Sequence, residues 1–243
     1  MYEKTGAIMT EFSSLLKDIL AEDLHALVLF GSAAGKAYNE SFSDINVLII
    51  LEKSNAAKIF RLGHSAKSFM RSNRITPIIM TREEFTAAVD VFPLEYSDIL
   101  ETHSVVYGNK DILDITVNRK NLRLQLEEKL RGSVADLRSI LIAAGGNEKV
   151  LEKLLLQWSS LGIAFFRGLL RLKEKNAAGL DTGAILAMVE KEYEVSLEGF
   201  SALSSLRQDK KNHLHTATSV ADMLLEPIKT LVNKVYAMGG ART

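Results

Sequence analysis

The residues of this chain that could do chemistry lie within positions 28–51, where two apolar runs flank a polar segment. The first run ends at Gly31 and Ser32, and the second opens with Asp44 and Asn46. Gly31 lets the backbone approach a phosphate closely, and the Ser32 hydroxyl adds a hydrogen-bond donor. Asp44 and Asn46, at positions i and i+2 of a strand, share a face and could both offer oxygen to a divalent metal ion. The segment therefore predicts a site that holds a phosphate and a metal ion together.

This combination of residue types suits phosphoryl transfer, in which a protein positions the reactants and neutralises the charge of the phosphates. Unpaired N–H groups at a strand-to-helix turn, together with the helix dipole, favour an anion, so we expect a turn of that kind at Gly31. Divalent metal ions held on clustered carboxylates usually neutralise the remaining charge. The polar segment therefore has the parts of a nucleotide-binding site.

The same segment resembles the signature of the nucleotidyltransferase superfamily, of the kanamycin and minimal nucleotidyltransferase type. The family pattern is an apolar strand, Gly-Ser or Gly-Gly, a spacer, and then Asp-x-Asp or Asp-x-Glu, with a third acid on a later strand. A helical second domain is a common partner in this superfamily. The resemblance covers roughly the first third of the chain. The matching residues are Phe30, Gly31, Ser32, Gly35, Ser43 and Asp44, followed by the apolar run 47–51.

The resemblance implies metal contacts at the end of this segment and nucleotide contacts before it. Asp44 and Asn46 are the implied ligands of Mg²⁺ or Mn²⁺, with Asn46 as an auxiliary ligand. The implied reaction moves a nucleoside monophosphate onto a hydroxyl of an unidentified acceptor and releases pyrophosphate. The residues implied to bind the nucleoside triphosphate are Gly31, Ser32, Lys36 and Ser43.

Two departures from the family pattern support an alternative function. Asn46 stands where the family has its second acid and lacks the negative charge. The expected third strand, 75–80, has no carboxylate, and either Thr76 or Ile78 takes the place of the third acid, while the acids in Thr81–Glu84 have the pattern of a helix start. Mg²⁺ prefers charged oxygen ligands, and the third acid is the usual candidate base. The alternative is a catalytically inactive homologue that acts as a nucleotide-binding or protein-interaction regulator.

The elements that must position these residues alternate between helix and strand patterns through residue 115. Apolar spacing predicts helices over 9–21 and 54–71, the second capped by Ser54. Pro77 should confine its strand to an edge of the sheet, because proline cannot donate a ladder hydrogen bond. We therefore expect an α+β fold with a nucleotidyltransferase-like mixed sheet domain over 1–115. The predicted strands are 25–30, 46–51, 75–80 and 103–107.

Strand patterns end after residue 115, and residues 116–243 have helical spacing only. Gly145 and Gly146 should end one helix, and the apolar residues of 150–172 predict one central helix buried on several sides. Asp181 should cap a shorter helix. We expect an all-α domain, a bundle of four or five helices. Its apolar faces would allow a role in acceptor specificity or in forming a homodimer.

Composition sets limits on the class of protein. Of 243 residues, 47% are hydrophobic and 25% charged, as in globular proteins with a buried core. The formal net charge is zero, which argues against non-specific nucleic-acid binding while leaving room for a local basic patch. The absence of cysteine excludes disulfides and thiolate catalysis. Without a run of about 18 uncharged apolar residues or a signal-peptide pattern, we expect a cytoplasmic protein with no membrane partner.

Overall fold

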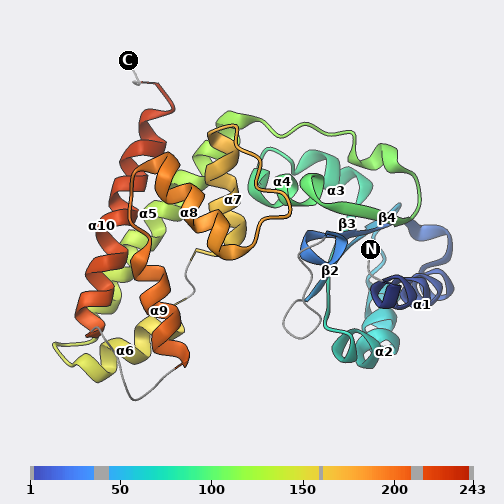
Figure 1. The fold of residues 1–243 in the computed structure, drawn as a ribbon. Coiled ribbons are helices and arrows are strands. Elements are labelled where there is room, and N and C mark those ends of the chain that lie inside the picture. The colour runs from blue at the N-terminus through green and yellow to red at the C-terminus, as the bar shows by residue number, and fades with distance from the viewer. Residues whose placement is uncertain (1–2, 36–43, 159–160, 209–215, 241–243) are drawn as a thin grey trace. The chain divides into compact units, whose positions relative to one another are not determined.

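The computed structural model describes residues 3–35, 44–158, 161–208 and 216–240 (Figure 1). Internal contacts divide the chain into two compact units, Met1–Asn118 and Arg119–Thr243. From the sequence, a domain boundary is expected after residue 115. That the two units are separate domains stays a prediction.

The first unit is built on a sheet that has four strands within the described residues, in the order β3-β2-β1-β4. The central strand β1 (Leu24–Phe30) pairs antiparallel with β2 (Ile45–Leu51) on one side and with β4 (His103–Tyr107) on the other. β3 (Ile75–Thr81) pairs parallel with β2 and forms an edge. Pro77 therefore lies in an edge strand, as expected. The predicted mixed sheet and α+β class are confirmed.

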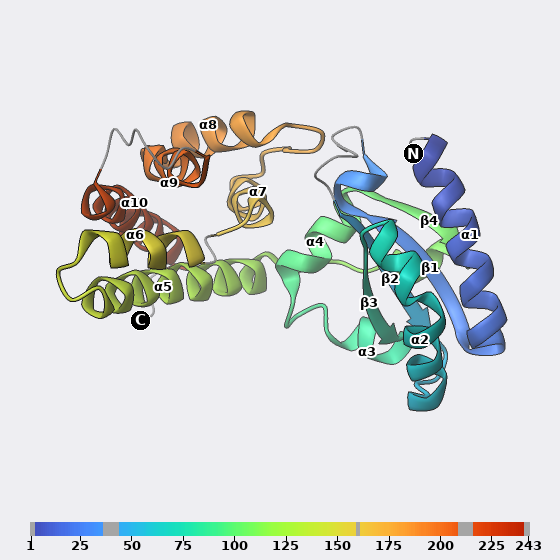
Figure 2. The same cartoon turned by 90° about the horizontal axis from the view of Figure 1, so that it is seen from below.

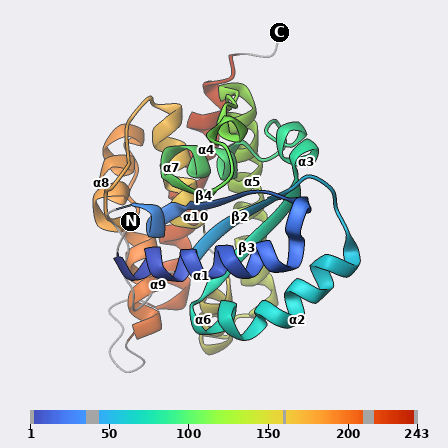
Figure 3. The same ribbon diagram turned by 90° about the vertical axis from the view of Figure 1, so that its right-hand side faces the viewer.

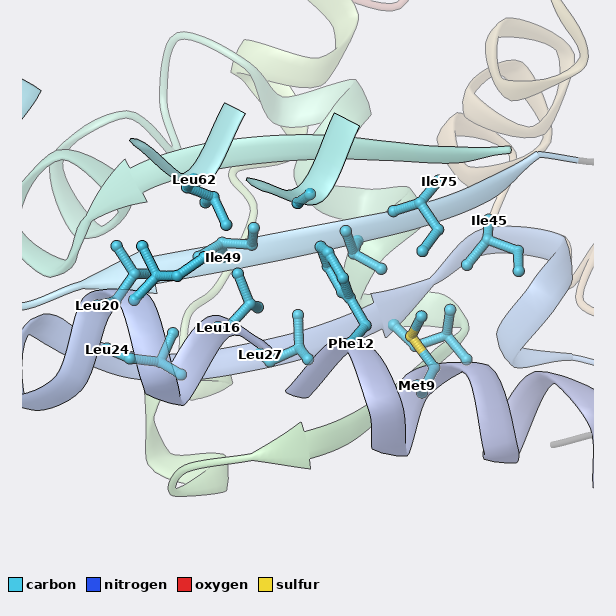
Figure 4. Packing of buried hydrophobic residues seen from close by; sticks show 14 of the residues in the cluster. Met9, Phe12, Leu16, Leu20, Leu24, Leu27, Ile45, Ile49, Leu62 and Ile75 are labelled. Atoms are coloured by element: carbon cyan, nitrogen blue, oxygen red, sulfur yellow. The ribbon is translucent and has the colours of Figure 1, made fainter. Parts of the chain in front are cut away.

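Two helices, α1 (Glu3–Leu20) and α2 (Ala56–Ser72), cover one face of this sheet (Figure 3). Figure 4 shows Met9, Phe12 and Leu16 of α1 directed at the strands. These side chains are buried in one apolar cluster with alternate residues of the strands, because successive strand residues point to opposite faces. The strand residues of this cluster include Leu27, Leu29, Val47, Ile49, Leu51 and Ile75.

The opposite face packs against shorter helices, α3 (Arg82–Ala87) and α4 (Pro93–Glu101), and the 3-10 turn η3 (Lys110–Leu113). The Tyr96 ring stacks on the Phe85 ring at a centroid distance of 4.7 Å, and its hydroxyl donates to the Phe85 carbonyl. Burial raises the pKa of Tyr96 to about 12, so the hydroxyl stays a donor at neutral pH. This pair fixes α3 and α4 against each other. The strand residues of the cluster on this face are Ala26, Val28, Leu48 and Ile50.

The starts of α2 and α3 are set by side-chain caps. The prediction of Ser54 as the cap of α2 is wrong, because Asn55 directly precedes the helix and its side chain accepts from the Lys58 N–H at 3.1 Å. The predicted helix start at Thr81 is confirmed. Thr81 and Glu84 form a reciprocal capping box, and the backbone N–H of Thr81 lowers the pKa of Glu84. The Glu84 carboxylate therefore serves as part of the cap at the start of α3.

The second unit is entirely helical in its described part, where six helices replace the predicted four or five (Figure 2). The two longest helices, α5 (Arg119–Ala143) and α10 (Ala217–Ala237), lie side by side, and α6 (Glu148–Gln157) packs against both (Figure 1). None of the described helices is both long and apolar enough to cross a membrane. The helices are α5 (Arg119–Ala143), α6 (Glu148–Gln157), α7 (Ile163–Leu172), α8 (Thr182–Tyr193), α9 (Glu198–Gln208) and α10 (Ala217–Ala237).

The prediction of one helix over 150–172 is wrong, because the chain leaves the helical conformation between α6 and α7. Trp158 has an extended backbone (φ −60°, ψ 124°), and so does Gly162 (φ −73°, ψ 169°), which precedes α7. Each helix buries part of its apolar residues, Leu151 and Leu155 in α6 and most of those in α7, so the apolar pattern continues on both sides of the break. Periodicity reports burial and therefore does not reveal such a break.

Two later helices meet at a point where one backbone hydrogen bond is missing. Pro227 lies inside α10 and has no N–H to donate to the Met223 carbonyl, four residues earlier. Gly199 of α9 packs on this carbonyl so closely that an added Cβ would lie 2.4 Å from the Met223 oxygen. The approach of α9 to α10 therefore requires glycine at position 199.

Candidate functional site

The predicted site residues gather at one end of the sheet. β1 ends there, while β2, β3 and β4 begin there, because β1 runs antiparallel to β2 and β4, and β3 runs parallel to β2. Gly31 and Ser32 follow β1, and Asp44 and Asn46 lie at the start of β2. Lys36 and Ser43, the other predicted nucleotide contacts, lie outside the described residues.

Gly31 lies next to Asn46. Its φ of +73° is in the left-handed region that favours glycine, and its N–H donates to the Thr102 carbonyl at 2.9 Å. A Cβ added to Gly31 would lie 3.5 Å from the Asn46 amide nitrogen Nδ2. The backbone after β1 and the side chain of Asn46 therefore form one surface.

The turn after β1 differs from the expected strand-to-helix turn. Residues Gly31–Ala34 form a single 3-10 turn, η2, closed by the Gly35 N–H, which donates to the Ser32 carbonyl at 3.1 Å. A Cβ on Gly35 would lie 2.9 Å from Cγ2 of Thr102, so a larger residue at position 35 would require the Thr102 side chain to shift. One 3-10 turn does not provide the dipole of a full helix. Any phosphate must therefore be bound by local groups, of which the Ser32 hydroxyl is one.

Asp44 and Asn46 differ in their surroundings. Asp44 is exposed just before β2, whose first N–H, that of Ile45, donates to the Arg74 carbonyl at 2.9 Å. Asn46 is half-buried and lies opposite Phe30 in the β1–β2 register. By strand alternation, Asp44 and Asn46 share the face of the sheet that carries the Tyr96 cluster.

The register of the parallel pair decides which residue stands beside Asn46. Thr76 is its partner in β3, and Ile78 is the partner of Leu48, one side-chain position further along the strand. Of the two residues that the sequence left open for the place of the third acid, Thr76 is the one paired with Asn46. β3 carries no carboxylate along its described length. Within the described residues, no three His, Asp or Glu side chains are grouped as a metal site.

His103 is a residue at this edge that sequence reasoning missed. It pairs with Phe30 on the side away from Asn46, so the side chains of all three share a face. The His103 Nδ1 lies 3.1 Å from the Ile99 carbonyl. Since a carbonyl only accepts, Nδ1 donates this hydrogen bond, which does not involve Nε2. A histidine that opens a short strand has no sequence signal that separates it from a surface residue.

The donor set at this edge is compatible with Mg²⁺ or Mn²⁺. Asp44 offers a carboxylate and Asn46 an amide oxygen, both hard ligands. Mg²⁺ commonly binds proteins through one or two carboxylates and takes its other ligands from substrate phosphates and water. The residues present therefore fit a metal ion that arrives with a triphosphate better than one held by the protein alone.

Comparisons with known proteins bear on the fold. No protein-family model matches the sequence, and no curated protein is detectably similar to it. Among solved structures, the chain is similar to spectinomycin adenyltransferase AAD(9) from Enterococcus faecialis, crystallised with ATP and spectinomycin. The TM-score is 0.55 and the sequence identity 11%, over 95% of this chain and 98% of the other. The prediction from the Gly31–Asp44 segment is thereby confirmed at the level of architecture: this chain has a nucleotidyltransferase-like fold.

Proposed function

We propose that this protein binds a nucleoside triphosphate together with Mg²⁺ or Mn²⁺ at the edge formed by Gly31, Ser32, Asp44 and Asn46. The observation that carries the proposal is the closeness of the Gly31 backbone to the Asn46 side chain, since a Cβ added to Gly31 would lie 3.5 Å from Nδ2. That closeness brings the turn and the start of β2 to one surface, in a fold shared with an adenyltransferase whose crystal structure contains ATP.

Each residue has a distinct role in this proposal. The left-handed Gly31 turns the chain away from β1, and Ser32 donates its hydroxyl to a phosphate oxygen. Asp44 and Asn46 hold the metal ion from neighbouring positions of one face. The metal ion, when bound, neutralises phosphate charge and so supports departure of pyrophosphate.

The proposed reaction is transfer of the nucleoside monophosphate to a hydroxyl of an acceptor. The acceptor hydroxyl must lose a proton, and the neutral hydroxyl of Thr76 is a poor base. His103 lies on the same face and uses Nδ1 for the Ile99 carbonyl, so that Nε2 of the neutral imidazole would accept the proton. We therefore assign the role of general base to His103.

The second candidate function is that of a catalytically inactive homologue that regulates by binding nucleotide or a partner protein. The observation that favours it is the pairing of Asn46 with Thr76, since neither of these neighbouring residues at the starts of β2 and β3 carries a negative charge. A protein of this kind would bind nucleotide without releasing pyrophosphate.

The test measures nucleotide binding by calorimetry with ATP, GTP, CTP and UTP, each with and without Mn²⁺. We expect saturable binding of at least one nucleotide with Mn²⁺, and its loss in Asp44→Asn. Asp18→Asn, which removes an exposed carboxylate on α1, is the matched control and should bind as the wild type does. Absence of binding for every nucleotide, or equal effects of the two variants, would refute the proposed site.

Pyrophosphate release with a panel of hydroxyl compounds then separates the two candidate functions. Transfer predicts release that falls in His103→Gln while nucleotide affinity stays unchanged. The inactive homologue predicts binding without release for every acceptor tested.

A further inference from the structure

A pocket of about 620 Å³ opens in the second unit, and none of its lining residues belongs to the proposed nucleotide site. It is formed by the first turns of α5, the end of α7 and the residues that follow α10. A volume of this size is typical of pockets for small organic molecules. Its lining combines Arg119, Lys120 and Arg123 with the apolar side chains of Leu124, Leu172 and Met238.

The charged side chains that line this pocket are all cations, one of which, Arg123, is paired with Glu127 outside the lining. Three cations line it, and no acidic residue is among the described residues that do. Arg119 and Lys120 also begin α5, whose first turn has no acid. Cations at this end of a helix repel the positive pole of its dipole. An anion bound beside these cations would reduce that repulsion.

The two arginines are held in place by hydrogen bonds within the second unit. The Arg119 Nη2 donates to the Leu172 carbonyl at 2.6 Å. The Arg123 Nη1 donates to Glu127 Oε2 at 2.6 Å, while its Nε is buried and has no hydrogen-bond partner within the described chain. Gly239 covers this guanidinium, since an added Cβ would lie 3.0 Å from Arg123 Nε. A buried donor without a partner calls for an explanation, and a bound ion is one.

We infer that this pocket binds a small organic anion, with a phosphate or carboxylate group on the cations and a short apolar body against Leu124, Leu172 and Met238. A guanidinium offers parallel N–H groups that match both kinds of oxyanion. Because the two arginines are already held, binding costs little side-chain ordering. The inference does not depend on nucleotide binding at the sheet edge.

The experiment titrates the full chain by calorimetry with phenyl phosphate, benzoate and inorganic phosphate. We expect saturable binding of phenyl phosphate or benzoate, and the one that binds more tightly identifies the head group. Lys120→Gln removes an exposed cation and should weaken that affinity about tenfold, as expected for a charge-assisted hydrogen bond. Leu124→Ser should weaken phenyl phosphate or benzoate and leave inorganic phosphate unchanged.

Two controls keep the result specific. Arg138→Gln makes the same change of charge on an exposed part of α5 outside this pocket and should leave the affinity unchanged. Asp44→Asn should do the same, which separates this pocket from the proposed nucleotide site. The inference is refuted if neither organic anion binds saturably, or if Lys120→Gln and Arg138→Gln weaken binding equally.

Discussion

Asn46 and Thr76 stand side by side at the starts of β2 and β3, and together they determine the charge of the proposed site. Both keep an oxygen atom at the edge of the sheet, but neither carries a negative charge. Asp44 is exposed directly before β2, and the described strands β2 and β3 themselves carry no carboxylate. A metal ion held by this set depends on the phosphates of its nucleotide for the remaining charge.

Asn46→Asp should tighten Mn²⁺ binding in the presence of nucleotide, because it adds a charged ligand beside Asp44. We expect a gain of about tenfold, equivalent to about 1.4 kcal/mol, measured by calorimetry. Two carboxylates on one strand face also repel each other, so the variant should unfold at a lower temperature without metal and recover with Mn²⁺. Unchanged metal affinity would count against the assigned site.

Gly31→Ala should lower the free energy of unfolding by about 1–2 kcal/mol, the cost of a left-handed backbone with a Cβ. The space around the new methyl group is adequate, since Asn46 Nδ2 would lie 3.5 Å away, so the cost comes from the backbone. Urea denaturation measures it. Gly63→Ala, in an exposed part of α2 with open space around it, should instead stabilise by about 0.5–1 kcal/mol. An unchanged free energy of unfolding in Gly31→Ala would contradict the left-handed backbone at position 31.

At the scale of elements, the packing of helices in the second unit depends on particular residues at the contact points as well as on buried apolar side chains. α9 approaches α10 where Pro227 leaves the Met223 carbonyl without its helical partner. Glycine at position 199 allows that approach. Along α5, Glu127 lies between Arg123 and Arg131, with 2.6 and 2.8 Å separating the paired atoms.

Gly199→Ala should destabilise the protein by about 1–3 kcal/mol, the usual cost of overpacking. The new Cβ would lie 2.4 Å from the Met223 oxygen, and a backbone carbonyl cannot rotate away as a side chain can. Gly132→Ala in α5, with nothing close to the added methyl group, is the control and should raise stability. Thermal unfolding followed by circular dichroism compares the two, and equal shifts would rule out the close approach.

Stability should fall in acid partly through Glu127. Burial raises the pKa of this carboxyl, but hydrogen bonds from Arg131 and Arg123 outweigh it and leave the pKa below its ordinary value of 4.5. The stabilisation is therefore present above pH 4.5 and is lost as the pH falls through the lower folded-state pKa. Glu127→Gln should be less stable than the wild type at pH 7, and the difference should shrink at pH 3. Urea titrations measure these stabilities. For Glu128→Gln, which changes an exposed neighbouring residue, the difference from the wild type should not shrink between pH 7 and pH 3.

At the scale of the whole molecule, two compact units of similar length share a chain without net charge. The nucleotide site is proposed in the first unit and the anion pocket in the second. A role of the helical unit in acceptor specificity or in forming a homodimer stays a prediction.

Ligand-induced stabilisation should depend on nucleotide and metal together. Because no three His, Asp or Glu side chains of the described residues are grouped as a metal site, Mn²⁺ alone should leave the unfolding midpoint unchanged, while Mn²⁺ with the preferred nucleotide should raise it. Saturation at 100 times the dissociation constant would add about 2.7 kcal/mol. Thermal-shift measurements with and without Mn²⁺, each with and without nucleotide, test whether the metal binds only together with the nucleotide. A shift with Mn²⁺ alone would show that the protein holds the metal without nucleotide.

Local patterns in the sequence predicted most of the first unit. Apolar runs located the strands, Pro77 indicated an edge, and Thr81 and Glu84 indicated a helix start, because each signal depends on residues close together in the chain. The segment from Gly31 to Asp44 likewise predicted a nucleotidyltransferase-like fold, and the similarity of this chain to a solved adenyltransferase agrees with that prediction. In the second unit the same patterns did not reveal the break between α6 and α7, since buried apolar residues occur in both helices.

By itself the sequence determined the order of the strands in the first unit, the class of fold and the segment that carries the candidate chemistry. Only the tertiary structure decided which distant residues share an edge: Thr76 beside Asn46, His103 on the same face, and the Gly31 N–H bonded to Thr102. Strand register and helix approach join residues far apart in the chain. Such contacts depend on how whole elements pack, which no local pattern of residue types records.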